Sequence, residues 1–206
     1  MFPQVSANLS VRYCSAYLKI DVASIAIQNQ TRFHNSHTLV VSGERAQESA
    51  ARATYKVFEP DRIDAREGAL KRHVDRYRPV HRWNEADVWE IIARWRVNPH
   101  PAYRLSWGRL SCATCIFGNA NQWASAQVVL PEQVKKIAEY EQEFGKTIDR
   151  NMSVLTKASI GQAYAPCQSA ALVAEARDEN WNSKIILEHG EWQLPAGAFG
   201  ESNGPT

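Results

Sequence analysis

The clearest hydrophobic pattern in the chain is helical and lies near its middle. Residues 84–95 read NEADVWEIIARW and place their apolar side chains on one face at helical spacing. Asn84 is a residue type that caps helices, and Asp87 follows it at the third helical position. Pro99 and Pro101 come next and cannot continue a helix. The pattern therefore predicts a helix that begins after Asn84 and ends before Pro99.

A second helical pattern begins at about Glu132 and ends before Gly145, which is a typical C-cap residue. The positions that share its face are Val134, Ile137, Glu141 and Phe144. The C-terminal tail, WQLPAGAFGESNGPT, is rich in glycine and proline and is predicted to be irregular.

A strand pattern lies upstream, in HTLVVSGER. Its apolar run, residues 39–41, predicts a buried strand that ends in a tight turn at Ser42 and Gly43 and leads into a helix over ERAQESAARATYKVF. Junctions of this kind bind nucleotides in α/β proteins, because the loop and the helix N-terminus present backbone N–H groups to phosphate.

Residues 62–82 carry an excess of basic side chains. The cations are Arg62, Arg66, Lys71, Arg72, Arg76, Arg78 and Arg82. A solvated basic face or a mobile loop is the ordinary interpretation of such a run. The functional alternative is a lid that faces an anion, and nucleic acid is a lesser candidate partner.

Composition narrows the class of protein only moderately. A chain of 206 residues forms one domain, or one domain with a tail, and a formal charge of +2 does not by itself indicate nucleic acid. No apolar run is long enough to span a bilayer, so we expect no membrane partner. Four cysteines are too few for a disulfide framework, which favours a cytoplasmic location.

The cysteines are the strongest candidate chemistry. Cys112 and Cys115 form a Cys-x-x-Cys in SCATC, a spacing that suits one metal ion or one cluster. Cys14 and Cys167 could complete a tetrahedral zinc site or a [4Fe-4S] cluster, or could each be an isolated small hydrophobic residue. A thioredoxin-type redox role ranks lower, because the pair lies in a loop bounded by prolines.

Several segments together resemble one family. RYCSAYLK, VVSGERAQESAAR, RPVHRWNEADVWEII, NPHPAY and GRLSCATCIFGN occur here in the order seen in phosphoadenosine phosphosulfate (PAPS) reductase-like proteins of the adenine nucleotide α-hydrolase group. The nearest likeness is to a phage and mobile-element branch, which is similar to the sulfur-handling protein of DNA phosphorothioation. The resemblance covers residues 1–150 and leaves residues 151–206 as a family-specific C-terminal extension.

The resemblance implies an α/β fold with a mainly parallel sheet flanked by helices, binding ATP or PAPS at the strand ends. The implied activity is adenine-nucleotide-dependent sulfur transfer or sulfonucleotide reduction. The candidate nucleotide contacts are Lys19, Ser42, Gly43, Arg45 and Arg52. In iron–sulfur members an early cysteine motif and a later Cys-x-x-Cys ligate a [4Fe-4S] cluster, and Cys14, Cys112 and Cys115 match these positions. Cys167 would be the fourth ligand, with zinc as the alternative metal.

Two departures from the family pattern limit the expected activity. The glycine-rich phosphate loop lies upstream of the RYC segment in the family, but the thirteen residues before Cys14 contain no glycine. We therefore expect an incomplete C-terminal portion of the family fold. The alternative is a non-catalytic, metal-stabilised binding module whose protein partner supplies the loop. No cysteine follows Cys167 to act as the reductase nucleophile, so no catalytic residue is assigned.

Overall fold

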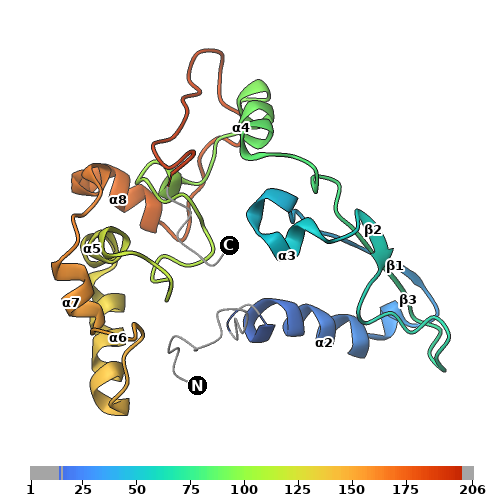
Figure 1. The fold of residues 1–206 in the computed structure, drawn as a ribbon. Coiled ribbons are helices and arrows are strands. Elements are labelled where there is room, and N and C mark those ends of the chain that lie inside the picture. Colours follow the sequence, from blue (N-terminus) through green and yellow to red (C-terminus); the bar gives the residue numbers. More distant parts are fainter. Residues whose placement is uncertain (1–13, 15, 201–206) are drawn as a thin grey trace. The chain divides into compact units, whose positions relative to one another are not determined.

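The computed structural model describes residue 14 and residues 16–200 (Figure 1). The described chain divides into two compact units, an N-terminal unit that ends at Asp87 and a C-terminal unit that begins at Val88. Within these described ranges, no helix has both the length and the apolar character needed to cross a membrane.

The N-terminal unit is built on a three-stranded sheet. Its strands are β1 (His37–Val41), β2 (Phe58–Pro60) and β3 (His73–Tyr77), in the order β1-β3-β2. Strand β1 pairs in parallel with β3, whereas β2 pairs antiparallel to it. Together with the helices that follow, this sheet confirms the predicted α/β class.

The prediction of a buried strand at residues 39–41 is wrong for one of its two faces. Along β1, burial alternates, and Leu39 and Val41 are 54% and 60% exposed. Phe58 and Tyr77, which pair with each other across β2 and β3, are also exposed. Parallel strands usually have both faces covered, so this sheet presents an unusually open apolar face.

The helical segments of the N-terminal unit are short. They are η1 (Ala16–Ile20), α2 (Asp21–Asn29), η2 (Thr31–Phe33), η3 (Ala46–Glu48) and α3 (Ala50–Ala53). The single long helix predicted after Gly43 is therefore wrong. Ser49 interrupts it, because its extended backbone separates η3 from α3 and its hydroxyl accepts a hydrogen bond from the backbone N–H of Arg52.

Helix α4 (Glu85–Arg94) confirms the prediction made from its apolar spacing. The cap is reciprocal, since the side chain of Asn84 accepts from the backbone N–H of Asp87 and that of Asp87 accepts from the backbone N–H of Asn84. The helix stops before η4 (Pro101–Tyr103), as the prolines predict.

The C-terminal unit is helical around one apolar core. Its remaining elements are α5 (Ala120–Val129), α6 (Pro131–Phe144), α7 (Val154–Ser159), η5 (Ala165–Gln168) and α8 (Ala170–Arg177). Helix α6 ends at Gly145 with a left-handed φ of 58°, as expected for its predicted C-cap. The core includes Val134 and Val154, so residues on both sides of position 150 belong to the same cluster.

The segment after α8 is irregular and is held by a few backbone contacts. This confirms the predicted irregular tail for residues 192–200, whereas residues 201–206 lie outside the described residues. Val97 and Ile186 form an isolated antiparallel bridge. Further on, the backbone N–H of Gly197 donates to the carbonyl of Tyr103 at 2.7 Å. The tail therefore closes over η4 and the loop that follows it.

Candidate functional site

The predicted phosphate-facing turn lies at the carboxyl end of β1. The backbone N–H of Ser42 continues the pairing with β3 by donating to the carbonyl of Tyr77 at 3.0 Å. The Ser42 hydroxyl donates to Oε2 of Glu44 at 3.0 Å. Gly43 lies beside open space, since a Cβ built there would meet no atom within 4 Å. The main chain at Gly43 is therefore open to an approaching ligand.

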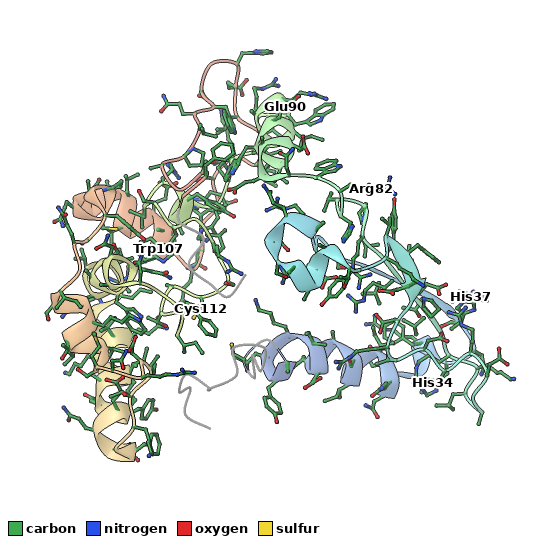
Figure 2. The ribbon with its side chains drawn as sticks, in the orientation of Figure 1. His34, His37, Arg82, Glu90, Trp107 and Cys112 are labelled. Atoms are coloured by element: carbon green, nitrogen blue, oxygen red, sulfur yellow. The ribbon has the colours of Figure 1, made fainter. Side chains whose placement is uncertain are left out.

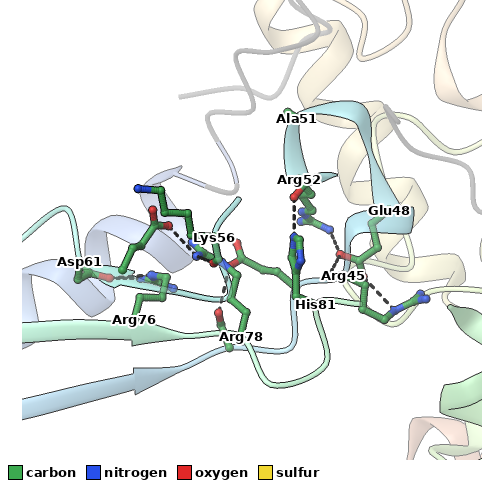
Figure 3. Close-up of polar contacts among 12 residues, drawn as sticks. Arg45, Glu48, Ala51, Arg52, Lys56, Asp61, Arg76, Arg78 and His81 are labelled. Carbon is green, nitrogen blue, oxygen red and sulfur yellow. Dashed lines mark hydrogen bonds and ion pairs between the residues drawn. The ribbon is translucent and has the colours of Figure 1, made fainter. Parts of the chain in front are cut away.

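Two of the predicted anion contacts, Arg45 and Arg52, share one carboxylate (Figure 3). Arg45 Nε lies 3.8 Å from Oε1 of Glu48, and the backbone N–H of Arg45 donates to Oε2 at 3.2 Å. Arg52 forms an ion pair with the same Oε2 through Nη1. One carboxylate neutralises one guanidinium, so Arg45, Arg52 and Glu48 together carry one net positive charge.

His81 ties this arginine cluster to the loop after β3. Its Nε2 donates to the carbonyl of Arg52 at 2.9 Å, and its own carbonyl accepts from the backbone N–H of Ala46 at 2.8 Å. The side chain is buried, and Figure 3 shows it pointing at the α3 segment. His81 therefore fixes the segment that carries both arginines.

Arg78 is a buried cation of this unit, and sequence reasoning missed its role. It donates to Glu44 at 2.7 Å, to Glu59 at 2.6 Å and to the carbonyl of Lys56 at 2.7 Å. Burial acts to raise the pKa of Glu44, but the hydrogen bonds from Arg78 and Ser42 outweigh it, and the net pKa is lowered. Glu44 is thus held as a carboxylate at the foot of the turn.

The basic stretch at residues 62–82 differs from the solvated face or mobile loop that its composition favours. Arg72 is buried and donates to the carbonyl of Ile63. Arg66 pairs with two carboxylates, and Arg76 pairs with the buried Asp61 at 2.6 Å. Four of the seven cations therefore form ion pairs within the described part of the chain, and three of these four have side chains that are less than one-third exposed.

Lys19, the remaining predicted nucleotide contact, lies exposed on η1. Within the described residues, no hydrogen bond or ion pair joins it to the Ser42–Gly43 turn or to the arginine cluster. The structure therefore brings together four of the five predicted nucleotide contacts and leaves Lys19 apart from their contact network.

The Cys-x-x-Cys segment forms two consecutive turns that lead into α5. Gln122 and Gln133 hold it from two helices, through the carbonyl of Ala113 at 3.3 Å and the hydroxyl of Thr114 at 3.0 Å. Cys112 is exposed and is labelled near Trp107 in Figure 2, whereas Cys115 is half-buried. Both thiols line one small pocket in the C-terminal unit.

Cys14 and Cys167 lie in different surroundings. Cys167 is 2% exposed in the apolar core, and its thiol donates to the carbonyl of Leu105 at 3.6 Å. Burial raises the pKa of this thiol, although a hydrogen bond with Ser125 opposes the shift. Cys14 belongs to the N-terminal unit.

The thiols brought together are fewer than a complete metal site requires. Cys112 and Cys115 supply two ligands, whereas a structural zinc or a [4Fe-4S] cluster takes four. In the part of the chain that the structure describes, no group of three or more His, Cys, Asp or Glu side chains is placed to hold a metal ion. Cys112 and Cys115 alone therefore do not form a complete ligand set for zinc or for a [4Fe-4S] cluster.

These features define an α/β protein with an open turn at a strand end, two arginines beside that turn, and a separate Cys-x-x-Cys loop. Residues 6–117 match the phosphoadenosine phosphosulfate reductase domain family. This match spans just over half of the chain. The chain therefore belongs to that family, as its motifs indicated.

One curated protein that is similar to this chain comes from a phage. The chain is 32% identical over 140 residues to the uncharacterized 37.8 kDa protein in the gpa 5′ region of Escherichia phage 186. The matched region covers 68% of this chain and 39% of the relative, so the chain spans less than half of that protein's length. No solved structure matches the chain.

Proposed function

We propose that this chain acts in adenine-nucleotide-dependent sulfur transfer or sulfonucleotide reduction, and that the turn after β1 holds the phosphate of the nucleotide. Membership of the PAPS reductase domain family supports the class of substrate. The observation that carries the proposal is the open Gly43 backbone beside two guanidiniums that share a single carboxylate.

The arrangement suits an anion that competes with Glu48. Phosphate oxygens accept hydrogen bonds from guanidinium groups in the paired geometry that carboxylates also use. A bound phosphate could take the place of the Glu48 carboxylate between Arg45 and Arg52, while the main chain at Gly43 lets it approach closely. Arg78 and His81 would keep the segment in position without touching the ligand.

Nucleotide binding tests this role directly. We expect Arg45→Ala and Arg52→Ala each to weaken ATP or PAPS binding about tenfold, the usual effect of losing one hydrogen bond between charged groups. Arg32→Ala is the matched control, because Arg32 lies on η2, before the opposite end of β1. Equilibrium dialysis with labelled nucleotide measures all three. Equal affinities in the two variants and the control would contradict the assignment.

A second candidate function is a binding module completed by a partner polypeptide. The exposed apolar face of the sheet favours it, because Leu39 and Val41 lie on the edge strand β1 and parallel strands are normally covered. The proposed occupant is a segment with apolar strands and a glycine-rich phosphate loop. The phage 186 relative extends well beyond the matched region, so a longer chain of this family exists.

Nucleotide binding by this chain, measured with and without the unmatched part of the phage 186 protein, distinguishes the two candidate functions. If this chain binds nucleotide by itself and the addition leaves the affinity unchanged, the first function stands alone. If nucleotide binding appears only with the added segment, and Leu39→Lys abolishes the association, the partner-completed module is correct.

We propose separately that Cys112 and Cys115 bind a metal ion or cluster. We expect anaerobically purified protein to contain iron with acid-labile sulfide, or alternatively zinc, and Cys112→Ser to lower that content. A matched Cys167→Ser variant shows whether the buried thiol is a further ligand. Protein without iron, zinc or sulfide would remove the metal from the proposal and leave the nucleotide site unaffected.

A further inference from the structure

A second pocket lies in the C-terminal unit, next to the cysteine loop but distinct from the nucleotide turn. Its volume is about 240 Å³. It lies among η4, the loop that contains Trp107 and Arg109, the carboxyl end of α5 and the carboxyl end of α8. Apolar side chains form its walls, including Leu105 and Val129 of the buried core.

The charges that line this pocket are all cationic. Arg109 and Arg177 both line it, and its lining includes no carboxylate. Within the described residues, neither guanidinium forms an ion pair or a side-chain hydrogen bond, in contrast to most arginines of the N-terminal unit. Arg177 lies in the last turn of α8, where the helix dipole favours a cation. Arg109 lies in an irregular loop and has no such role.

Trp107 and His100 also line this pocket, and each side chain carries a hydrogen-bond donor. Trp107 is only 5% exposed, and its buried indole Nε1–H has no hydrogen-bond partner among the described residues. Buried donors are nearly always paired, so this one points to a missing acceptor. His100 accepts from the backbone N–H of Ala102 at 3.1 Å through Nδ1, which places the proton of the neutral ring on Nε2 as another donor.

We propose that this pocket binds a small aromatic oxyanion, with the ring against the apolar wall and the oxyanion between Arg109 and Arg177. Guanidinium groups recognise carboxylate, phosphate and sulfate alike, so the shared chemistry is an oxyanion on a planar apolar body. The volume lies below the range of drug-sized sites, which limits the ligand to about one ring.

This site borders the cysteine loop, because Trp107 and Arg109 also line the pocket that contains Cys112 and Cys115. The two pockets are therefore neighbours, with two lining residues in common. The inference does not depend on the nucleotide turn, since it uses no residue of the N-terminal unit.

Phenyl phosphate is the probe for the experiment, and intrinsic tryptophan fluorescence of the full chain is the readout. We expect saturable binding of phenyl phosphate, which Arg109→Ala and Arg177→Ala each weaken about tenfold. Arg94→Ala is the matched control, since Arg94 is an exposed arginine of the same unit that does not line the pocket. Trp107→Phe replaces the indole with a smaller phenyl ring and removes the N–H, and it should weaken binding by a smaller factor.

Two control ligands separate the contributions of the charge and of the aromatic ring to the binding affinity. Benzyl alcohol lacks the charge and inorganic phosphate lacks the ring, and we expect both to bind at least tenfold more weakly than phenyl phosphate. No saturable binding of phenyl phosphate up to about 10 mM would overturn the proposal. Binding that Arg109→Ala and Arg177→Ala leave unchanged would place the ligand elsewhere and overturn it equally.

Discussion

At Gly197 the absence of a side chain is a packing requirement. A Cβ at this position would lie 2.3 Å from the carbonyl oxygen of Trp107 and 2.8 Å from that of Tyr103. Both neighbours are backbone atoms of the loop over which the tail closes, so they cannot rotate away as a side chain would. The glycine-rich tail, which the sequence predicted only as irregular, is thus part of the packing of the C-terminal unit.

We expect Gly197→Ala to lower the free energy of unfolding by about 1–3 kcal/mol, the usual range for forced overpacking. Urea denaturation followed by circular dichroism measures the change. Gly43→Ala is the control, because a methyl group there meets open space and should change stability by less than about 0.5 kcal/mol. Equal stabilities of the two variants would show that the tail does not pack against the loop as described.

The connection between α6 and α7 depends on one buried carboxylate. Glu141 is 6% exposed, and its two oxygens accept hydrogen bonds from the backbone N–H groups of Ile148 at 2.8 Å and Val154 at 2.9 Å. Helical spacing alone placed Glu141 on the apolar face of its helix. Only the fold supplies the backbone donors that make a carboxylate acceptable there.

We expect Glu141→Gln to lower the free energy of unfolding by about 1–3 kcal/mol, because the amide NH₂ would face one of the two buried backbone N–H groups and leave that donor without an acceptor. Glu139→Gln on the same helix is the control, since its side chain is 52% exposed. Chemical denaturation of both variants measures the difference. A Glu141→Gln protein as stable as the control would exclude this role for the carboxylate.

Each of the two units is stabilised internally by a different kind of interaction. The C-terminal unit has a contiguous apolar cluster that includes Trp123, Ile148 and Val154. The buried hydrophobic residues of the N-terminal unit are few among those described, Ile63 and Val74 being the examples, and its interior also contains arginine–carboxylate pairs. The N-terminal unit should therefore be the more sensitive of the two to acid.

The pKa values in the N-terminal unit set the direction of that acid effect. A hydrogen bond from Arg66 is the largest cause that lowers the pKa of Asp64 from 3.8 to about 2, and the pKa of Glu44 is also lowered from its ordinary 4.5. A carboxyl group whose pKa is lower in the folded state stabilises the fold above its unfolded pKa. That contribution is lost as the pH falls through the folded pKa.

We therefore expect the melting temperature to fall as the pH is lowered from about 4.5 towards 2, and Asp64→Asn to make this decline shallower. Thermal melts at a series of pH values test both statements. Asp87→Asn serves as a comparison because it changes a half-buried carboxylate at the cap of α4 that belongs to none of the ion pairs described above. A wild-type profile as flat as that of Asp64→Asn would contradict the assigned pKa.

Local signals in the sequence were enough for the elements whose causes are local. The apolar spacing, the Asn84–Asp87 cap and Gly145 predicted α4 and the end of α6, because helix caps and periodicity act within a few residues. The same kind of reasoning placed Ser42 and Gly43 at a strand end. The order of several short motifs was sufficient to indicate the family.

Tertiary structure decided everything that depends on contacts between distant segments. It set the pairing of β1 with β3, the contacts of Arg78 with Glu44 and Glu59, the burial of Cys167, and the pocket at Arg109. A basic run or a lone cysteine has the same sequence signature whether its side chains face water or a buried partner. Charge and burial energies depend on the atoms within a few ångströms, and only the fold brings those atoms together.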